Sequence, residues 1–582
     1  MKVKLVNDNF ARDYGKNLLL SRGIKDIDTF LNPTSDCLQS WRDLDNIENG
    51  VNLIKNLSNT SHVGLIIDCD VDGFTSASII YQYLKKLFPE INIDCYLHEG
   101  KAHGLEEHIE IIQSIKYNLI IIPDAGSNDS QYAKEVDCPI LIIDHHLVED
   151  LNFSPNMTII NNQLSSNYNN KNLSGAGVTY QFCRALDEHF SVKYSESYID
   201  LAALGVCGDM MSGLEVENQY LWKKGFSQIK NYFFITLVRK QAYSITGKVG
   251  ASDEDILEAL TPISVAFYIV PLINAMIRVG SKEEKERLWL AFIDGHMKVP
   301  SNKRGAKGQL EEVAIESTRE CINSRSHQNK IKEEAVSKVE QKILKYGLLD
   351  NKILFIQLDE DDSFPSELNG LLAMQLSAKY KRPTIVARLN NEGYIRGSIR
   401  GLNHSELNSF KDYLDSTKLC EYVIGHDNAA GVSISEANLS KLMSTANQDL
   451  KDFDFGEDFY EVQFERQAYS SDLASLIEDI SNYKFCWSTL NEEPYIYIKD
   501  LHFDAKDIQI MGKTSNTVKI VKNGIAYMKF FADDMIEELH QYGDNIKMEV
   551  VGRANLNYWM GTITPQIFIE NYEIKEEKPT DF

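Results

Sequence analysis

Short apolar runs alternate with helical stretches through the first third of the chain. The runs lie near residues 64–67, 91–97, 119–122, 140–143 and 158–160. Runs this short and this apolar are typical of parallel strands that are covered on both faces. The pattern therefore predicts an α/β domain with a doubly wound parallel sheet.

The pattern changes further along the chain. Residues 310–349 are charged on one side and apolar on the other, which predicts a long connecting helix. Apolar runs return from 352 to about 435 and predict a second α/β domain, and alternating residues after 495 predict an OB-fold β-barrel. The predicted parts are a helical lead-in at 1–55, the parallel-sheet domain at 56–300, the connecting helix at 301–350, the second α/β domain at 351–450 and the barrel at 455–582.

Composition narrows the class of protein. The chain has 582 residues, which is too long for one core, and its hydrophobic content of 43% is ordinary for a globular protein. Its nine cysteines stand singly, no apolar run approaches the ~20 residues that span a bilayer, and the first residues lack a signal-peptide core. We expect a cytoplasmic monomer that contacts no membrane. The net charge of −25 argues against a protein that coats nucleic acid, but leaves room for a local basic groove.

Three carboxylates leave the first predicted strand together, as Asp68, Asp70 and Asp72. Acids at alternate positions repel one another unless a cation lies between them, and a hard divalent metal is the usual partner. An acidic solvated loop or a helix cap is the alternative interpretation. The segment lacks the later Glu of an EF-hand and follows a buried strand, which favours a catalytic site at a strand end.

The later strands end in similar groups. Asp124 follows the run at 119–123, and Asp144, His145 and His146 end or follow the run at 139–143. Each alone would be a cap or a surface histidine, but the carboxyl ends of parallel strands share one edge of the sheet. Asp209 lies in an apolar helix, where an unpaired carboxylate is costly unless it faces a cation. Together these residues predict a metal site.

Five segments in order resemble the DHH phosphoesterases and, within them, the RecJ single-strand-specific DNA exonucleases. They are 68–73, 123–126, 144–146, 173–178 and 203–209. By this resemblance two ions, Mn²⁺ or Mg²⁺, would be held, one by Asp68, Asp70 and Asp124 and the other by Asp72, Asp124, His145 and Asp209. The resemblance also implies that His146 contacts the scissile phosphate, that Asp144 orients the imidazoles, and that a water shared by the metals attacks the terminal phosphodiester.

The resemblance extends to substrate contacts. Residues 351–450 resemble the DHHA1 partner domain of the family. The family usually has arginine where this chain has His98 and Leu272, which puts its phosphate contacts there in question. Tyr558 and Trp559 would either stack on bases or pack in the barrel. The implied substrate-binding residues are His98, His103, Ser174, Asn274, Arg278, Arg396, Ser398, Arg400, His426, Tyr558 and Trp559.

The resemblance implies a metal-dependent 5′-to-3′ exonuclease that hydrolyses single-stranded DNA to mononucleotides in repair, recombination or replication. A single-strand-binding protein and a helicase are candidate partners. Three other interpretations remain. A small-substrate DHH phosphodiesterase, acting on oligoribonucleotides or cyclic dinucleotides, needs neither the long helix nor the barrel. A silent Cdc45-like replication scaffold should have lost metal ligands, and a pure single-strand binder leaves the acids unexplained.

Overall fold

The computed structural model describes residues 1–6, 12–100, 102–148, 150–359, 364–488, 491–512, 516–542, 545–559 and 562–575. The chain forms two compact units. The N-terminal unit consists of Arg22–Gln328 and Phe485–Glu492, and the C-terminal unit of Met1–Ser21, Asn329–Lys484 and Glu493–Phe582. We describe each unit by itself.

A parallel sheet of five strands forms the centre of the N-terminal unit. The strands are β2 (His62–Ile67), β3 (Asn92–Leu97), β4 (Leu119–Pro123), β5 (Ile140–Asp144) and β6 (Met157–Asn161). Their order is β3-β2-β4-β5-β6, and all neighbours are parallel, which confirms the predicted α/β domain. From β2 the chain passes to β3 on one side of it and then to β4 on its other side, so the strand order reverses at β2. In open parallel sheets, ligands bind outside the carboxyl ends of the strands at such a switch point.

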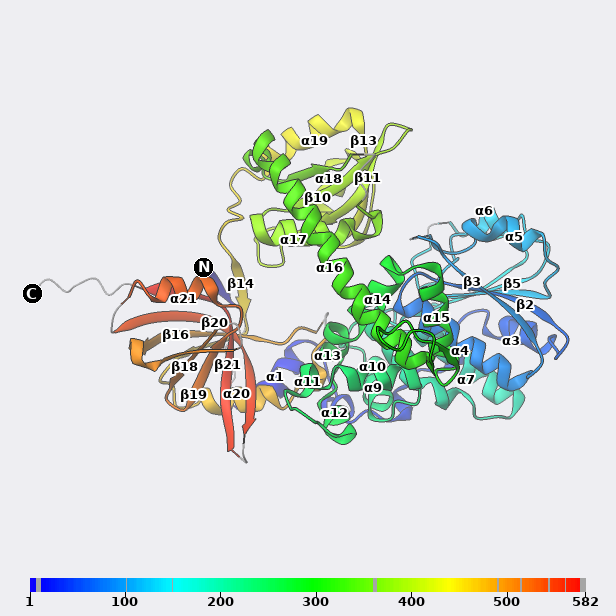
Figure 1. The fold of residues 1–582 in the computed structure, drawn as a ribbon, viewed down its shortest axis with the longest axis horizontal. Helices are drawn as coiled ribbons and strands as arrows, with labels where there is room; N and C mark the ends of the chain where they lie inside the picture. The colour runs from blue at the N-terminus through cyan, green and yellow to red at the C-terminus, as the bar shows by residue number, and fades with distance from the viewer. Residues whose placement is uncertain are drawn as a thin grey trace, which may run out of the picture. The chain divides into compact units, whose positions relative to one another are not determined.

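Helices cover both faces of this sheet (Figure 1). Successive residues of β2 point to opposite faces, so Leu65 and Ile67 join the larger apolar core while Ile66 joins the smaller one. The helices of this unit are α2 (Ile27–Leu31), α3 (Ile47–Lys55), α4 (Val71–Leu87), α5 (Ile109–Gln113), α6 (Ser130–Ala133), α7 (Gly175–Phe190), α8 (Ile199–Gly208), α9 (Val216–Ser227), α10 (Tyr232–Lys240), α11 (Ala242–Thr246), α12 (Asp253–Ala259), α13 (Pro262–Tyr268), α14 (Val270–Val279) and α15 (Lys282–Ile293). The larger core includes residues of α4, α7 and α8, and the smaller one residues of α5 and α6.

One apolar stretch, Pro262–Val279, has the length and composition of a membrane span. Half of it is buried inside the protein, and it is divided at Ile269 between α13 and α14. Val265, Ile273 and Met276 of this stretch belong to the larger core. Packing within the unit therefore accounts for the apolar pattern of this stretch.

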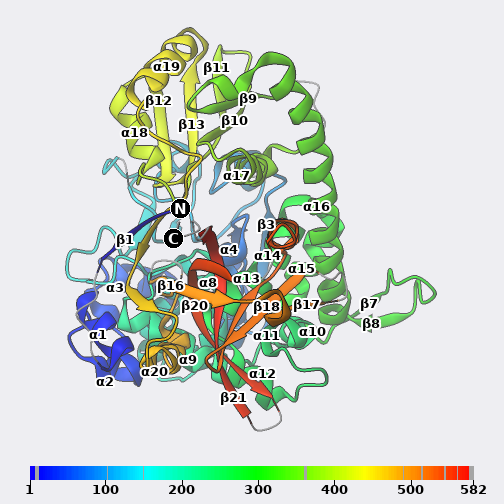
Figure 2. The same cartoon turned by 90° about the vertical axis from the view of Figure 1, so that its left-hand side faces the viewer.

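After α15 the chain forms a hairpin of β7 (Lys298–Pro300) and β8 (Leu310–Glu312) and enters the long helix α16 (Val313–Tyr346). This 34-residue helix lies where the sequence predicts one, and Figure 2 shows it from the side. Its first part, to Gln328, belongs to the N-terminal unit, and the remainder belongs to the C-terminal unit.

The C-terminal unit contains a second α/β sheet. Its strands are β9 (Leu354–Gln357), β10 (Thr384–Leu389), β11 (Tyr394–Arg400), β12 (Cys420–His426) and β13 (Ala429–Ser435), and the helices beside them are α17 (Asn369–Tyr380), α18 (Phe410–Thr417) and α19 (Glu436–Asp449). The strand order is β12-β13-β11-β10-β9, with only the β10–β9 pair parallel. This mixed sheet lies where the sequence predicts the second α/β domain.

The last region is rich in strands. They are β14 (Phe459–Val462), β15 (Phe464–Gln467), β16 (Tyr495–Phe503), β17 (Ile508–Met511), β18 (Thr517–Lys522), β19 (Ile525–Lys529), β20 (Ile546–Trp559) and β21 (Thr562–Lys575), with helices α20 (Leu473–Ser481) and α21 (Asp533–Leu539). Seven of them form one sheet in the order β15-β16-β20-β21-β19-β18-β17. Among the described residues, no pairing of β15 with β17 closes this sheet. The OB-fold barrel therefore stays a prediction.

The N-terminal residues form an element that the sequence pattern did not predict. Strand β1 (Lys2–Leu5) pairs in parallel with β14, and it is followed by helix α1 (Tyr14–Ser21). The backbone N–H of Gly15 in that helix donates a hydrogen bond to Asp479 of α20. The start of the chain is therefore tied to the C-terminal unit. The predicted division into five domains stays a prediction beside these two units.

Close packing between α8 and α9 leads to a first test. A Cβ added at Gly225 would lie 2.6 Å from the Cβ of Ala203 and 2.8 Å from the carbonyl oxygen of Ile199. Alanine normally stabilises a helix interior by about 0.5–1 kcal/mol over glycine. We predict instead that Gly225→Ala lowers stability by about 1–3 kcal/mol, because overpacking outweighs helix propensity. Thermal unfolding beside Ser227→Ala, an exposed change in the same helix, measures this, and a stabilised Gly225→Ala would contradict it.

Candidate metal centre

The predicted acids gather at the carboxyl edge of the parallel sheet, at its switch point. Asp68 follows β2, Asp70 is the N-cap of α4, and Asp72 lies in the first turn of that helix. The side chain of Asp70 accepts a hydrogen bond from the N–H of Gly73, at 3.0 Å. A Cβ on Gly73 would lie 2.7 Å from the carbonyl oxygen of Asp68, so glycine permits this tight approach.

The N-terminus of α7 holds Asp72 in place. Its carboxylate accepts hydrogen bonds from the hydroxyl of Ser174 at 2.8 Å, the N–H of Gly175 at 2.7 Å and the N–H of Ala176 at 3.1 Å. These are the free N–H groups of a helix start, where negative charge is favoured. Ser174, which the resemblance assigned to the substrate, is thus directed at Asp72.

Asp124 has the strained backbone of the site. It follows β4 with a φ of +71°, in the left-handed region that Asn and Asp tolerate better than most residues. Its Oδ1 lies 3.2 Å from Nε2 of His145, which also lies 3.4 Å from Asp209 and 3.9 Å from Asp72. Both the Oδ1 of Asp124 and the Nε2 of His145 are buried without a hydrogen-bond partner among the described residues. Asp209 is the C-cap of α8.

Asp144 organises the two histidines that follow it. Its Oδ1 accepts hydrogen bonds from the N–H of His145 at 2.7 Å and from Nδ1 of His146 at 2.8 Å, and its Oδ2 accepts one from the N–H of Ser127. His145 is buried, whereas the side chain of His146 is 52% exposed. The predicted orienting role of Asp144 is consistent with this geometry.

The pKa shifts favour the neutral form of the buried acids and the cationic form of His146. Burial and the neighbouring carboxylates raise the pKa of Asp124 and of Asp209 well above the usual range, and burial and Asp70 raise the pKa of Asp72 to about 6. Burial opposes charge on His146, but its hydrogen bond to Asp144 raises its pKa to about 9. The carboxylates of Asp124 and Asp209 are therefore not fully compensated by positive charge, which a bound cation would supply.

The donor groups suit a divalent metal. Ligand atoms of Asp68, Asp70 and Asp124 lie within 4.8 Å of one another, and so do those of Asp72, His145 and Asp209. Oxygen donors with one or more imidazoles are ligands that Mn²⁺ accepts, and Mg²⁺ prefers the oxygens. The buried Oδ1 of Asp124 and Nε2 of His145, which make no hydrogen bond among the described residues, are what such an ion would bind. These residues therefore fit the group that the sequence predicts.

The other predicted contacts in this unit lie in different surroundings. His103 approaches the centre, and its Nδ1 lies 2.8 Å from Asp68. His98 does not, because its ring is buried and its Nδ1 is bonded to Glu107 at 2.7 Å. Burial lowers the pKa of Arg278 in α14, and the negative charge of Asp70 partly opposes this shift. The Oδ1 of Asn274 is buried without a hydrogen-bond partner in the part of the chain described.

Sequence reasoning missed Arg325 of α16. Burial and the charge of Arg278 lower the pKa of its guanidinium. Arg325 donates a hydrogen bond to Gln328 at 2.7 Å, and Arg278 has no hydrogen-bond or ion-pair partner among the described residues. No local signal in the sequence marks Arg325, because its charge matches the charged side predicted for the helix at 310–349.

The remaining predicted residues belong to the C-terminal unit. Arg396, Ser398 and Arg400 lie on β11, and His426 ends β12. Arg396 forms an exposed ion pair with Glu392 at 3.6 Å, and Arg400 donates to the carbonyl of Ile399 at 2.7 Å. The backbones of Tyr558 and Trp559 continue β20, but their side chains lie outside the described residues.

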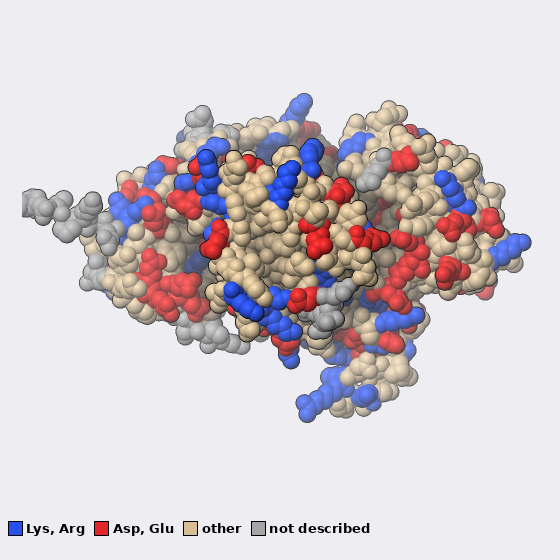
Figure 3. Space-filling view, turned by 90° about the horizontal axis from the view of Figure 1, so that it is seen from above, with Lys and Arg blue, Asp and Glu red and all other residues tan. Residues whose placement is uncertain are grey.

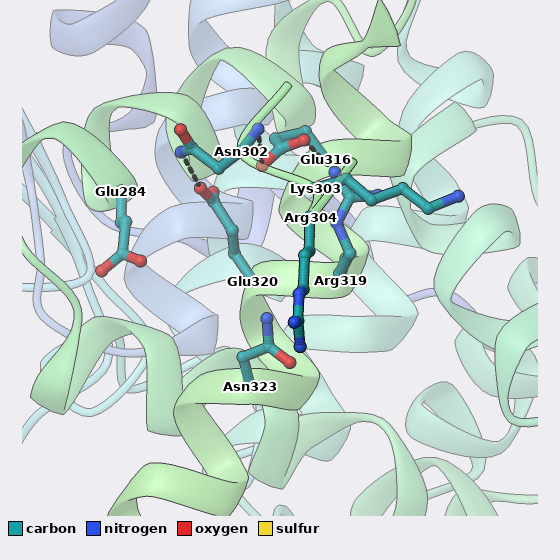
Figure 4. Close-up of a pocket in the computed structure, with 8 residues that line it drawn as sticks. All are labelled: Glu284, Asn302, Lys303, Arg304, Glu316, Arg319, Glu320 and Asn323. Atoms are coloured by element: carbon teal, nitrogen blue, oxygen red, sulfur yellow. Dashed lines mark hydrogen bonds and ion pairs between the residues drawn. The ribbon is translucent and has the colours of Figure 1, made fainter. Parts of the chain in front are cut away.

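A cavity of about 510 Å³ lies elsewhere in the N-terminal unit (Figure 4). It shares no residue with the strand-edge cluster. Arg319 pairs there with Glu316, and Arg287 beside the cavity pairs with Glu320, so its charges are largely compensated internally. The lining residues are Glu284, Asn302, Lys303, Arg304, Glu316, Arg319, Glu320 and Asn323.

Acidic and basic side chains are interspersed on the surface seen in Figure 3. Among the described residues, that face carries no continuous basic area of the kind that would neutralise a long stretch of phosphates. The distribution agrees with the net charge of −25.

Comparison with known proteins agrees with the fold and shows the family. Residues 62–206 match the N-terminal domain of the DHH family, a stretch that contains every strand-edge acid except Asp209. YorK of the SPbeta prophage of Bacillus subtilis, whose name proposes a single-strand DNA-specific exonuclease, is 34% identical over 99% of both chains. RecJ of Bacillus subtilis is 24% identical over 88% of this chain and 61% of its own length.

Solved structures show the same fold. RecJ of Thermus thermophilus in complex with Mn²⁺ superposes with a TM-score of 0.71 and 18% identity, over 99% of this chain and 80% of that one. Its complex with Mg²⁺ gives a TM-score of 0.65 over 99% of this chain and 79% of that one, also at 18% identity. The chain belongs to the RecJ-like single-strand DNA-specific exonucleases of the DHH family.

The uncompensated acids predict how Asp124→Asn affects stability. The raised pKa of Asp124 means that the metal-free folded protein loses stability as pH rises above the unfolded value of about 3.9. Asparagine keeps the shape and tolerates the left-handed backbone. In EDTA at pH 8 the variant should be more stable than the wild type by about 1–2 kcal/mol in the free energy of unfolding, so its melting temperature should be a few degrees higher. This difference in melting temperature should become smaller towards pH 5.

Metal should reverse this order. Mn²⁺ should raise the melting temperature of the wild type and have little effect on Asp124→Asn, because the variant lacks a predicted metal ligand. Asp137→Asn, an exposed change in the same unit, should behave as the wild type does. An Asp124→Asn protein that is less stable in EDTA at pH 8 and equally stabilised by Mn²⁺ would contradict the interpretation.

Proposed function

We propose that this protein hydrolyses single-stranded DNA from the 5′ end to mononucleotides at a two-metal centre, in DNA repair, recombination or replication. The observation that carries the proposal is a pair of buried atoms, Oδ1 of Asp124 and Nε2 of His145, which lie 3.2 Å apart at the switch point of the sheet and make no hydrogen bond among the described residues. The RecJ relatives are named as single-stranded-DNA-specific exonucleases, and the Thermus thermophilus structures are described with Mn²⁺ and Mg²⁺.

The proposed ligands follow the donor sets at the strand edge. One ion would be held by Asp68, Asp70 and Asp124, and the second by Asp72, Asp124, His145 and Asp209, so Asp124 serves both. Bound divalent cations supply a lowered pKa for water and stabilise the charge that develops on phosphoryl oxygens. The ammonium or guanidinium groups of a protein can stabilise charge on phosphoryl oxygens, but they do not lower the pKa of a bound water as a metal ion does.

The protein's own groups position the phosphate. His146 is half exposed beside the buried acids, and the hydrogen bond to Asp144 favours its cationic form, with a pKa of about 9. A cationic imidazole at this edge can donate a hydrogen bond to a phosphodiester oxygen. Asp144 fixes the ring through Nδ1, which leaves Nε2 directed away from that carboxylate.

Arg278, whose pKa is affected by the charge of Asp70, and Arg325, whose pKa is affected by the charge of Arg278, supply further positive charge. Two guanidinium groups that repel each other are favoured by an anion placed between them, and a phosphate accepts several N–H donors at once. Gln328 adds an Nε2 donor that is buried without a partner among the described residues. This pair would hold a substrate phosphate in a chain where His98 and Leu272 stand at the family's arginine positions.

The experiment that tests the function is cleavage of end-labelled DNA. With Mn²⁺ or Mg²⁺, single strands should be shortened from the 5′ end to mononucleotides while duplexes persist, and EDTA should stop the reaction. Asp209→Asn should reduce kcat by at least about 100-fold, because it removes a ligand of the metal ion whose positive charge stabilises the transition state. Asp137→Asn should not reduce kcat. Nicking of a circular single strand, or full activity in EDTA, would refute the proposal.

Arg325 allows a separate test of substrate binding. Arg325→Ala should lower kcat/KM roughly 10- to 100-fold, the effect of losing a charge-assisted hydrogen bond worth about 1.5–3 kcal/mol. The loss should lie mainly in KM and reduce the salt slope of binding by about 0.7, as for one phosphate on a single strand. The matched control is Arg304→Ala on the exposed 301–309 loop, and equal behaviour of the two variants would remove Arg325 from the site.

A further inference from the structure

The end of helix α8 places methionine where glycine is the usual residue. The N–H of Met210 donates to the carbonyl of Cys207 at 3.3 Å, and the N–H of Met211 donates to that of Val206 at 3.1 Å. These two hydrogen bonds define a Schellman motif, in which the residue after the C-cap takes a left-handed backbone and is usually glycine. Met210 occupies that position with a φ of +54°. A side chain is therefore kept where the local backbone favours glycine.

Packing inside the protein does not explain this side chain. Met211 packs against the larger apolar core, whereas Met210 is 51% exposed and belongs to neither core of the N-terminal unit. Among the described residues of this unit, Met210 is also the only apolar residue other than glycine with a left-handed backbone. Strain that brings no burial in return is typical of residues kept for function.

Met210 directly follows a predicted metal ligand. The Oδ2 of Asp209 lies 3.4 Å from Nε2 of His145 in the strand-edge cluster. Consecutive Cα atoms are ~3.8 Å apart, so the side chain of Met210 starts at the border of that cluster. A half-exposed apolar group therefore lies next to the acids and histidines of the candidate metal centre.

A second exposed apolar side chain follows His146. Leu147 is 76% exposed, but its backbone is restrained. Asn161 donates a hydrogen bond from Nδ2 to the carbonyl of His146, and Asn128 donates one from Nδ2 to the carbonyl of Leu147, both at 3.0 Å. The leucine is thus presented to solvent by a segment that side-chain amides hold in place.

We propose that Met210 and Leu147 contact the base of a nucleotide that flanks the scissile phosphodiester. The inference rests on the proposed exonuclease function, which brings a phosphate to His146 and the metal ligands. Each base is separated from that phosphate only by a sugar, and its ring is the part of the substrate that matches apolar side chains.

The chemistry of methionine suits a contact that accepts every base. A thioether interacts favourably with aromatic rings, and its unbranched chain adapts to rings of different size. Every base has a π-face, so such a contact holds the nucleotide without reading the sequence. The strained backbone at Met210 would thus direct an adaptable side chain at the substrate.

Strands that lack one base test the contact. The full-length protein with Mn²⁺ is given single strands in which a tetrahydrofuran residue replaces either nucleotide beside the first scissile bond. At one of these positions the wild type should lose roughly 3- to 10-fold in kcat/KM, the range expected for a sulfur–aromatic contact. Met210→Gly should lose a similar factor on the normal strand, mainly in KM, and should barely distinguish the two kinds of strand.

Glycine at position 210 removes the side chain and suits the backbone, so the variant should fold and its melting temperature should not fall. Met210→Leu should keep most of the activity, and Leu147→Ala should lose discrimination as Met210→Gly does. Val249→Ala, which changes a side chain that is 92% exposed between α11 and α12, is the control and should match the wild type.

The effect of Mn²⁺ on melting temperature separates base contact from support of Asp209. Mn²⁺ should raise the melting temperature of Met210→Gly as much as that of the wild type, and a smaller rise would overturn the inference. Equal cleavage of normal and base-free strands by the wild type, or full discrimination in Met210→Gly or Leu147→Ala, would overturn it and leave the exonuclease function intact. A wild type that does not cleave DNA would overturn both.

Discussion

Mutual repulsion among buried carboxylates is the constraint on which the N-terminal unit depends. Asp72, Asp124 and Asp209 are brought together at one edge of the sheet, and burial and their neighbours raise the pKa of each. A protein gains nothing in stability from such an arrangement unless a cation shares it. Tight loops and helix ends must therefore hold the acids in place against their own repulsion.

The topology supplies that restraint. The reversal of strand order between β2 and β4 brings the ends of two strands together, and the N-terminus of α7 directs three donors at Asp72. Asp124 is held in a left-handed conformation, and glycine at position 205 lets α8 pack against Asp72, whose oxygen would lie 2.3 Å from an added Cβ. These features hold the functional groups in place and introduce local strain, which is common in active sites.

Much of this could be predicted from the sequence. The apolar runs locate all five strands of the parallel sheet, because strands that are buried on both faces leave a strong pattern. The acids that gather at the edge could be named because parallel strands end on one side. The resemblance to the RecJ exonucleases implied how these acids and His145 are divided between two ions, and it agrees with the family to which the chain belongs.

Other features depend on contacts that local pattern does not contain. Strand β1 forms because residues 2–5 pair with residues 459–462, more than four hundred positions away. Arg325 lies near Arg278 only through the packing of α16, and Ser174 contacts Asp72 rather than solvent. His98 was expected at the substrate because of its place in a family motif, but the structure buries its ring beside Glu107 and His108. The barrel closure and the side chains of Tyr558 and Trp559 stay predictions.

Anomalous X-ray diffraction from crystals soaked in Mn²⁺ tests the central claim most directly. The account predicts two anomalous peaks at the carboxyl edge of the parallel sheet, one among Asp68, Asp70 and Asp124 and the other among Asp72, Asp124, His145 and Asp209. The two peaks should share Asp124 as a ligand. Crystals with full Mn²⁺ occupancy elsewhere and no peak at this edge, or with a single peak that leaves the buried oxygen of Asp124 without a metal, would contradict it.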